Sequence, residues 1–163
     1  MEFEHILVVN DPDQPDIPLL TSEDVWFGLL CRAEDPVAFL PGLERCEIIE
    51  REEQRLVRDL YFGQMRVRDH VTLQPLQSIC FEAQASEQHP GGRLTISLEN
   101  PAPQVMTLRF RYETSLDQAN IADAANPEEA AKIVEYIRSA YYNSDLDTLK
   151  RIRLIAQQRS RAQ

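Results

Sequence analysis

The sequence has few of the side chains that bind metals or form covalent cross-links. Its 163 residues include three cysteines and three histidines, and no CxxC or HxxxH spacing occurs. The cysteines are odd in number, widely separated and set among apolar neighbours: Cys31, Cys46 and Cys80. We therefore predict buried, unreactive thiols in a reducing cytoplasm, with no disulfide framework, no metal site and no cofactor.

Basic residues and long apolar segments are also scarce. The chain has 17 Lys and Arg residues against 27 Asp and Glu residues, which gives a formal net charge of −10. A field of this sign repels phosphate groups and anionic lipid headgroups, so we expect neither nucleic acid nor a membrane surface as a partner. No apolar segment approaches the roughly 20 residues that span a bilayer, and the acidic amino-terminal segment lacks the features of a secretory signal.

The rest of the composition is typical of a globular domain. Hydrophobic residues make up 43% of the chain and charged residues 27%. A chain of this length buries roughly two-thirds of its unfolded surface, which suits one domain over residues 1–163. We find no internal repeat, low-complexity segment or linker that would divide it.

Hydrophobic spacing and turn residues predict the order of the elements. A strand at 2–9 is followed by a proline-rich connection, which cannot be helical. Thr21 or Ser22 caps a helix that runs to about Ala33, and a second short helical piece ends near Gly42. Six short strands with turn residues between them then follow, at 45–52, 55–62, 65–74, 78–87, 93–100 and 104–114.

The last segment predicts a long amphipathic helix. Asn126 suits the N-cap and Pro127 the first helical position, while the two glutamates that follow face the positive helix end. Residues 143–145 (Asn-Ser-Asp) are a possible kink. An antiparallel sheet with one apolar face needs a cover, and this helix is the one available. The order predicts an α+β helix-grip fold, in which a curved seven-stranded antiparallel sheet wraps around the long C-terminal helix.

The segment RVRDHVTL raises the question of whether its charged residues act together. If residues 63–64 form a two-residue turn, Arg58 lies opposite Asp69 on the apolar face, while Arg68 and His70 face outward. An unpaired charge on the apolar face would cost several kcal/mol, so this pair needs partners or water. Two interpretations remain open: a structural ion pair that fixes the strand register, or a polar anchor at the base of a cavity.

Other side chains are candidates for the lining of such a cavity. The aromatic residues Phe27, Tyr136 and Tyr142 are expected in the core. A structural role is the favoured interpretation of His5. The face of the sheet on which His5, Glu47 and Glu50 lie is undetermined. The candidate lining residues on the strands and helices are Trp26, Phe81, Ile96, Phe110, Tyr112, Ile137 and Tyr141.

Several segments of the chain resemble a known family. They are FEHILVVNDP, LTSEDVWFGLLCRAEDPVAFLPGLERCEIIERE, RVRDHV and ASEQHPGGRLTISLENP. The chain is similar to the AtaL-like branch of the START/Bet v1-like (SRPBCC) superfamily. The resemblance implies a deep cavity between the sheet and the C-terminal helix, used in the superfamily for lipids, polyketides or hormones. Some members are cyclases, aromatases or hydrolases, and many only bind; the resemblance implies no catalytic residue.

Three functions are consistent with these features. The first is a small-molecule binding protein that holds an apolar or amphipathic ligand, with its polar end near Arg58 and Asp69. The second is a cyclase, dehydratase or isomerase in which Asp69 is the general base and Arg58 stabilises an enolate-like oxyanion. The third is a structural or partner-binding module in which the pair is purely architectural. The strand edges also permit a homodimer.

Overall fold

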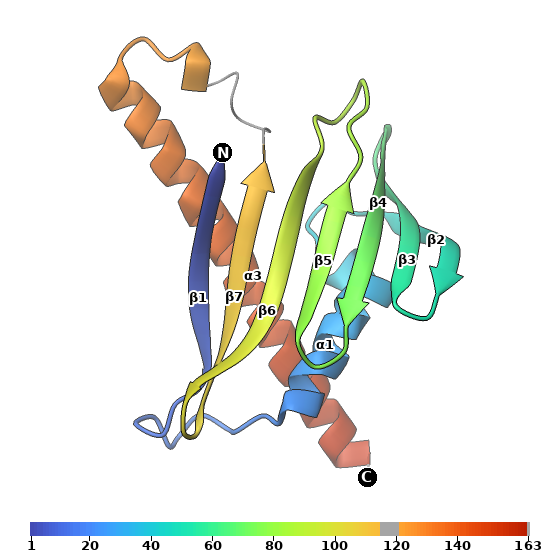
Figure 1. Ribbon diagram of the computed structural model, residues 1–163, viewed down its shortest axis with the longest axis vertical. Coiled ribbons are helices and arrows are strands. Elements are labelled where there is room, and N and C mark those ends of the chain that lie inside the picture. Colours follow the sequence, from blue (N-terminus) through green and yellow to red (C-terminus); the bar gives the residue numbers. More distant parts are fainter. Residues whose placement is uncertain (115–120, 163) are drawn as a thin grey trace.

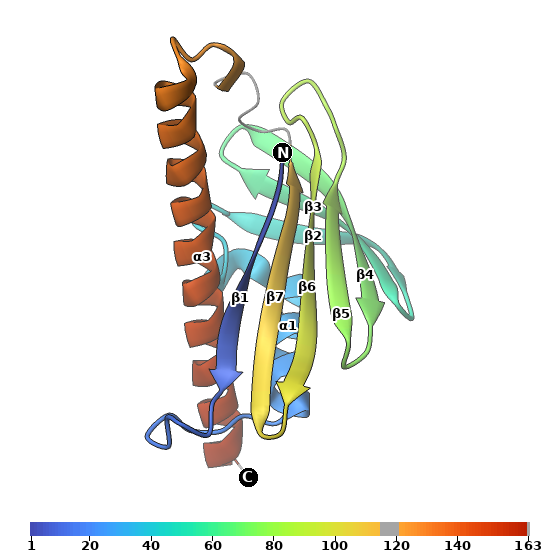
Figure 2. The same ribbon diagram turned by 60° about the vertical axis from the view of Figure 1, so that its left-hand side comes forward.

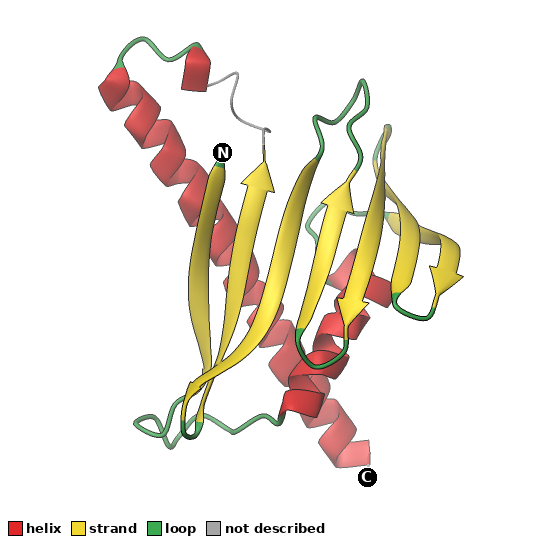
Figure 3. Ribbon diagram, viewed as in Figure 1, coloured by secondary structure: helices red, strands yellow, loops and turns green. Residues whose placement is uncertain are grey.

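A seven-stranded antiparallel sheet curves around α1 and α3 in the computed structural model, which describes residues 1–114 and 121–162 (Figure 1). The strands are β1 (Glu2–Asn10), β2 (Arg45–Glu52), β3 (Arg55–Phe62), β4 (Met65–Gln74), β5 (Ser78–Ala83), β6 (Gly92–Ala102) and β7 (Val105–Thr114). The helical elements are α1 (Ser22–Glu34), the 3₁₀ turn η1 (Pro36–Ala38) and α3 (Pro127–Ala162). Figure 3 shows both long helices on the same side of the sheet.

The strand order is β1-β7-β6-β5-β4-β3-β2, so six strands form a meander and the first strand is added beside the last. The pairing of β1 with β7 is antiparallel and joins residues 96 to 111 positions apart. Figure 2 shows the sheet bending away from β1 towards β2, with α3 along the β1 side. The predicted helix-grip fold is confirmed.

The register of the β3–β4 hairpin agrees with the prediction from its turn. Phe62 pairs with Met65 across the two-residue turn, which places Arg58 opposite Asp69. Gly63 has a φ of +59°, a left-handed conformation that glycine adopts without steric cost. Because side chains alternate between the two faces of a strand, this one turn determines which charges of the hairpin point towards the helices.

Two predicted boundaries were wrong. β5 ends at Ala83 rather than at residue 87, because the following segment folds into a loop with its own hydrogen bond, from the Ser86 N–H to the His89 carbonyl. Gly91 continues this loop with a φ of +85°. The second short helix, expected to end near Gly42, is only the single turn η1.

Both helix starts follow from side-chain capping. Thr21 and Asp24 form a capping box, in which each side chain accepts a hydrogen bond from the backbone N–H of the other at 3.0 Å. At the start of α3, the Asn126 side chain accepts from the Glu129 N–H at 2.8 Å. The possible kink at residues 143–145 does not occur, since α3 is continuous through them.

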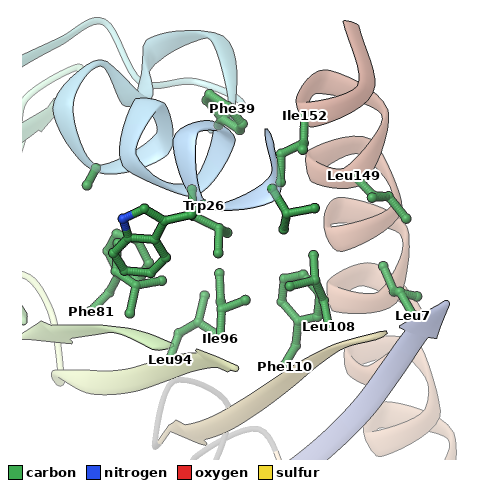
Figure 4. Close-up of a cluster of buried hydrophobic side chains, with 14 of the residues drawn as sticks. Leu7, Trp26, Phe39, Phe81, Leu94, Ile96, Leu108, Phe110, Leu149 and Ile152 are labelled. Atoms are coloured by element: carbon green, nitrogen blue, oxygen red, sulfur yellow. The ribbon is translucent and has the colours of Figure 1, made fainter. Parts of the chain in front are cut away.

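The core lies between the concave face of the sheet and the two helices. Figure 4 shows Phe81, Ile96 and Phe110 on the strands pointing towards Trp26 on α1 and Ile152 on α3. The helices approach closely where they cross, because a Cβ atom on Gly28 would lie only 2.7 Å from Cγ1 of Ile152. A glycine is therefore needed at the crossing.

Some side chains are more exposed than predicted. The three cysteines are free and half-buried rather than buried. Tyr136 is 76% exposed, and Phe27 and Tyr142 are also exposed rather than in the core. Tyr142 still contacts β1, since its ring lies 5.3 Å from that of His5 between centroids. Neither long helix, within the described residues, combines the length and the apolarity needed to cross a bilayer.

Candidate functional site

Arg58 and Asp69 form a buried, bidentate ion pair on the inward face of the sheet. The Arg58 Nε donates to Asp69 Oδ1 at 2.9 Å, and Nη2 donates to Oδ2 at 2.6 Å. The two residues are 1% and 4% exposed. The predicted placement of the pair is confirmed, and its geometry is the two-point contact that a guanidinium prefers with a carboxylate.

The third nitrogen of Arg58 contacts the end of α1. Its Nη1 donates to the backbone carbonyls of Arg32 and Ala33, at 3.3 and 3.0 Å. These carbonyls belong to the last turn of the helix, where acceptors lack intrahelical partners and the helix dipole is negative. Arg58 thus ties β3, β4 and α1 together. This set of contacts favours the structural interpretation of the pair, and its contact with a ligand stays a prediction.

A second buried polar cluster joins α3 to β1 and β7. Asp145 on α3 is 0% exposed and accepts hydrogen bonds from the Tyr112 hydroxyl at 2.8 Å. His5 Nε2 lies 2.7 Å from the same carboxylate. Burial raises the pKa of Asp145, and the hydrogen bonds from His5 and Tyr112 counter this effect. Burial also raises the pKa of Tyr112, and the nearby Asp145 carboxylate adds to the rise.

Sequence reasoning missed Asp145 and left the facing of His5 open. The missed indication was spacing: Ile137, Tyr141 and Asp145 follow one another at four-residue intervals, so the carboxylate lies on the inward stripe of the helix. An acidic residue on an otherwise apolar stripe indicates a buried partner, and His5 is that partner.

A third polar group, Arg32 on α1, is buried without an ion pair. It is 6% exposed, and its guanidinium carbon lies 4.6 Å from the centre of the Phe81 ring. Burial lowers the pKa of Arg32, while Tyr112 and Asp145 nearby favour its charged form. Within the described residues, the Arg32 side chain has no hydrogen bond, and its enclosed Nε is without a partner.

Aromatic rings fill the space between the edge of the sheet and α3. The rings of Phe3 and Tyr112 stack at 5.1 Å between centroids, and Tyr141 lies 4.3 Å from Tyr112. A hollow of about 740 Å³ lies next to these rings at the amino-terminal half of α3. Its lining comes from α3 and from residues 123–124, and no strand residue of the described chain is part of it: Asp123, Ala124, Glu129, Lys132, Ile133, Tyr136, Ile137, Ala140 and Tyr141. Neither Arg58 nor Asp69 lines this hollow.

The other candidates fall into two groups. Ile137 and Tyr141 line the hollow. The core residues, whose contact with a ligand stays a prediction, are Trp26, Phe81, Ile96, Phe110 and Tyr112. The side chains of Glu47 and Glu50 are 55% and 61% exposed, so these two carboxylates do not flank Arg58.

The fold defines the class of protein: a curved antiparallel sheet around a long C-terminal helix, as in Bet v1 and START domains. The sequence matches the AtaL family, described as Acetylaranotin biosynthesis cluster protein L, over residues 7–159. The chain belongs to this family. Among curated proteins, the sequence comparison finds no match.

Solved structures of similar shape include two aromatase/cyclases and human STARD10. The di-domain aromatase/cyclase StfQ of the steffimycin pathway has a TM-score of 0.68 and 15% identity, covering 98% of this chain. This chain spans about half of StfQ, 51% of its length. Zhui aromatase/cyclase from Streptomyces sp. R1128 has a TM-score of 0.59 and 18% identity, covering 99% of this chain and 96% of its own. Human STARD10 has a TM-score of 0.59 and 8% identity, and the match covers 93% of this chain and 62% of STARD10. Such low identities show a shared fold alone.

Proposed function

We propose that the protein binds a small apolar or amphipathic molecule, of a lipid-, polyketide- or aromatic-like class, in the hollow along the amino-terminal half of α3. The observation that carries the proposal is the hollow of about 740 Å³ beside the aromatic rings. Its volume is in the range of pockets that hold small organic ligands. Family membership and the aromatase/cyclase neighbours support a ligand of this class.

The lining of the hollow suits an amphipathic ligand, because the charged side chains of Asp123, Glu129 and Lys132 accompany the apolar ones. Ile137 and Tyr141 come from the inward stripe of α3, one turn apart, and continue towards the rings of Phe3 and Tyr112. Aromatic faces contribute large contact areas with little loss of side-chain freedom. Tyr141 also contacts the Tyr112 ring, and the Tyr112 hydroxyl donates to the buried Asp145 carboxylate.

Titration of the protein with Nile red, a neutral apolar dye, tests the proposal. Ile137→Trp places a larger side chain in the hollow and should weaken binding by about tenfold. The matched control is Leu154→Trp, which adds the same ring to the same helix but lies outside this hollow. Equal affinity of the two variants, or no saturable binding by the native chain, would contradict the proposal.

The enzyme alternative, a cyclase, dehydratase or isomerase, is a second candidate. The Asp69 and Arg58 side chains already bind each other at two points, which leaves little capacity for a reacting group. The chain from His5 through Asp145 to the Tyr112 hydroxyl is better suited to proton transfer, because burial raises the pKa of the carboxyl and makes it a stronger base.

Deuterium incorporation into a β-diketone, followed by NMR in D₂O, tests this alternative. Removal of a proton next to a carbonyl is a step common to such reactions, and it exchanges the proton for deuterium. Asp145→Asn should abolish catalysed exchange if the Asp145 carboxylate is the base. Asp69→Asn should abolish it if the Asp69 carboxylate is the base. Exchange no faster than in buffer, for the native chain, would exclude both assignments for this substrate.

A further inference from the structure

Two buried polar atoms lack partners within the described residues: Nε of Arg32 and Oγ1 of Thr148. Such groups are rare in folded proteins, because burial removes water without supplying another hydrogen bond. The neighbouring Arg58 differs, since Asp69 and two backbone carbonyls take up its donors. The contrast shows that the interior satisfies one guanidinium fully and leaves the other open.

The helix crossing brings these two groups to the same part of the interior. Gly28 and Ile152 mark the point of contact between α1 and α3. The start of α1 lies beside the end of α3, where the Arg159 guanidinium lies 3.7 Å from the Phe27 ring centre, so the helices run in opposite directions. Arg32 comes one turn after Gly28, and Thr148 comes one turn before Ile152. Both therefore lie on the same side of the crossing.

The chemistry of the pair is that of a site for an oxyanion. A guanidinium presents several N–H donors in one plane, and the threonine hydroxyl adds another donor. The face of the Arg32 guanidinium rests on Phe81, which leaves the donors at its edge free for a ligand. Asp145, which favours the charged form of Arg32 more than Asp69 does, is engaged by His5 and Tyr112. No carboxylate among the described residues pairs with Arg32.

We propose that Arg32 and Thr148 bind the carboxylate of an apolar organic acid, whose body extends along α3 towards the hollow. This inference rests on the proposed function, and it specifies the chemical class of the ligand. The hollow reaches Tyr141, and Thr148 follows seven residues later, about 10 Å along the helix axis. A ligand with an apolar body of about that length spans both.

Matched acids and alcohols test the inference by isothermal titration calorimetry at pH 7, where the acids are ionised. The pairs are decanoate with decanol, and 2-naphthoate with 2-naphthalenemethanol, which separate an aliphatic body from an aromatic one. The native chain should bind at least one acid about tenfold more tightly than its alcohol, a difference of 1.4 kcal/mol. Arg32→Met should remove this preference, because it weakens the binding of the acid much more than that of the alcohol.

Two further variants sharpen the result. Thr148→Val removes the hydroxyl with little change of shape and should weaken acid binding several-fold. If Arg32→Met does not fold, the result for Thr148→Val tests the inference by itself. Arg159→Met, a control on α3 away from the site, should keep the preference. Equal affinity for acids and alcohols, or a preference retained in both site variants, would overturn the inference while the proposed function stands. Absence of binding in both series would overturn both.

Discussion

Two arginines, buried to a similar degree, have opposite surroundings in this protein. Arg58 donates to a carboxylate and to the open end of a helix, so its removal affects three elements at once. Arg32 rests on an aromatic ring and, among the described residues, lacks an ion pair. The first arrangement is typical of architecture and the second of recognition, because a fully paired charge has nothing left to offer a ligand.

Asp69→Ala should destabilise the protein by about 3–5 kcal/mol, because it leaves the Arg58 charge buried and unpaired. The double variant Arg58→Met with Asp69→Leu should lose much less, since no charge remains. Urea unfolding measures both. The exposed pair of Arg51 and Glu34 provides the control, and Glu34→Gln should cost at most about 1 kcal/mol. A double variant as unstable as the single one would show that the carbonyl contacts of Arg58 dominate.

The contribution of the buried Asp145 to the free energy of unfolding should decrease as the pH rises. Its pKa is raised in the folded state, so the folded chain binds more protons than the unfolded chain between the ordinary pKa and the raised one. The free energy of unfolding of Asp145→Asn, minus that of the native chain, should therefore increase with pH across this window.

Asp59 is the matched control for this pH dependence. The hydrogen bond from Arg68 lowers the pKa of Asp59. The contribution of Asp59 to stability is therefore present above its ordinary pKa and is lost as the pH falls. The corresponding difference for Asp59→Asn should decrease as the pH rises. Chemical denaturation between pH 3 and pH 8 measures both, and the same sign for the two variants would contradict the assignment.

At the scale of elements, α1 and α3 approach each other closely where they cross. The crossing brings backbone against side chain at Gly28 and Ile152, and it determines where Arg32 and Thr148 lie. The carboxyl end of α1 is held by the two hydrogen bonds that Arg58 donates to its carbonyls. The middle of α1 is thus fixed by packing against α3, and its carboxyl end by hydrogen bonds to the sheet.

Gly28→Ala should destabilise the protein by about 1–3 kcal/mol, despite the higher helix propensity of alanine, because the new Cβ clashes with Ile152. Ile152→Ala removes the two carbon atoms at 2.7 and 2.8 Å, so the double variant should be more stable than the sum of the single effects predicts. Thermal unfolding of the four proteins in this cycle gives the coupling energy. Strict additivity would mean that the helices move apart instead.

The helices and strands could be predicted from the sequence, whereas the crossing of α1 with α3 could not. A two-residue turn at Gly63 implied the whole register of the β3–β4 hairpin, and capping residues implied both helix starts. These are local features, so short segments contain the information. The burial of Arg32 escaped prediction because it depends on which helix faces meet, and that depends on packing between distant segments. For Asp145, the helical spacing indicates an inward position, but its partners His5 and Tyr112 are distant in the sequence.

At the scale of the whole molecule, α3 is held unevenly. Its buried residues lie mostly in the carboxyl-terminal half, from Asp145 to Ala156, whereas Ile137 is the buried residue of the first half. The hollow lies along that first half. Figure 1 shows this end of the helix projecting beyond the start of β1. The part of the helix that borders the proposed ligand site is therefore the part with the least packing.

Amide hydrogen exchange should reflect this asymmetry. Residues 127–136 should exchange faster than residues 145–156, because opening the first half of α3 exposes less buried surface. A ligand that binds in the hollow should slow exchange in the first segment more than in the second. Mass spectrometry of the exchanged peptides measures both effects, and uniform protection along the helix would contradict this view of α3.

The pairing of β1 with β7 has a consequence for synthesis. The strand that leaves the ribosome first must wait for residues 105–114 before it can enter the sheet. Contacts between such distant segments form slowly, because a long loop must close before they yield any free energy. During translation the amino-terminal strand, with its apolar Ile6 and Val8, is thus an unpaired edge, and this interval is when the nascent chain is most exposed to aggregation.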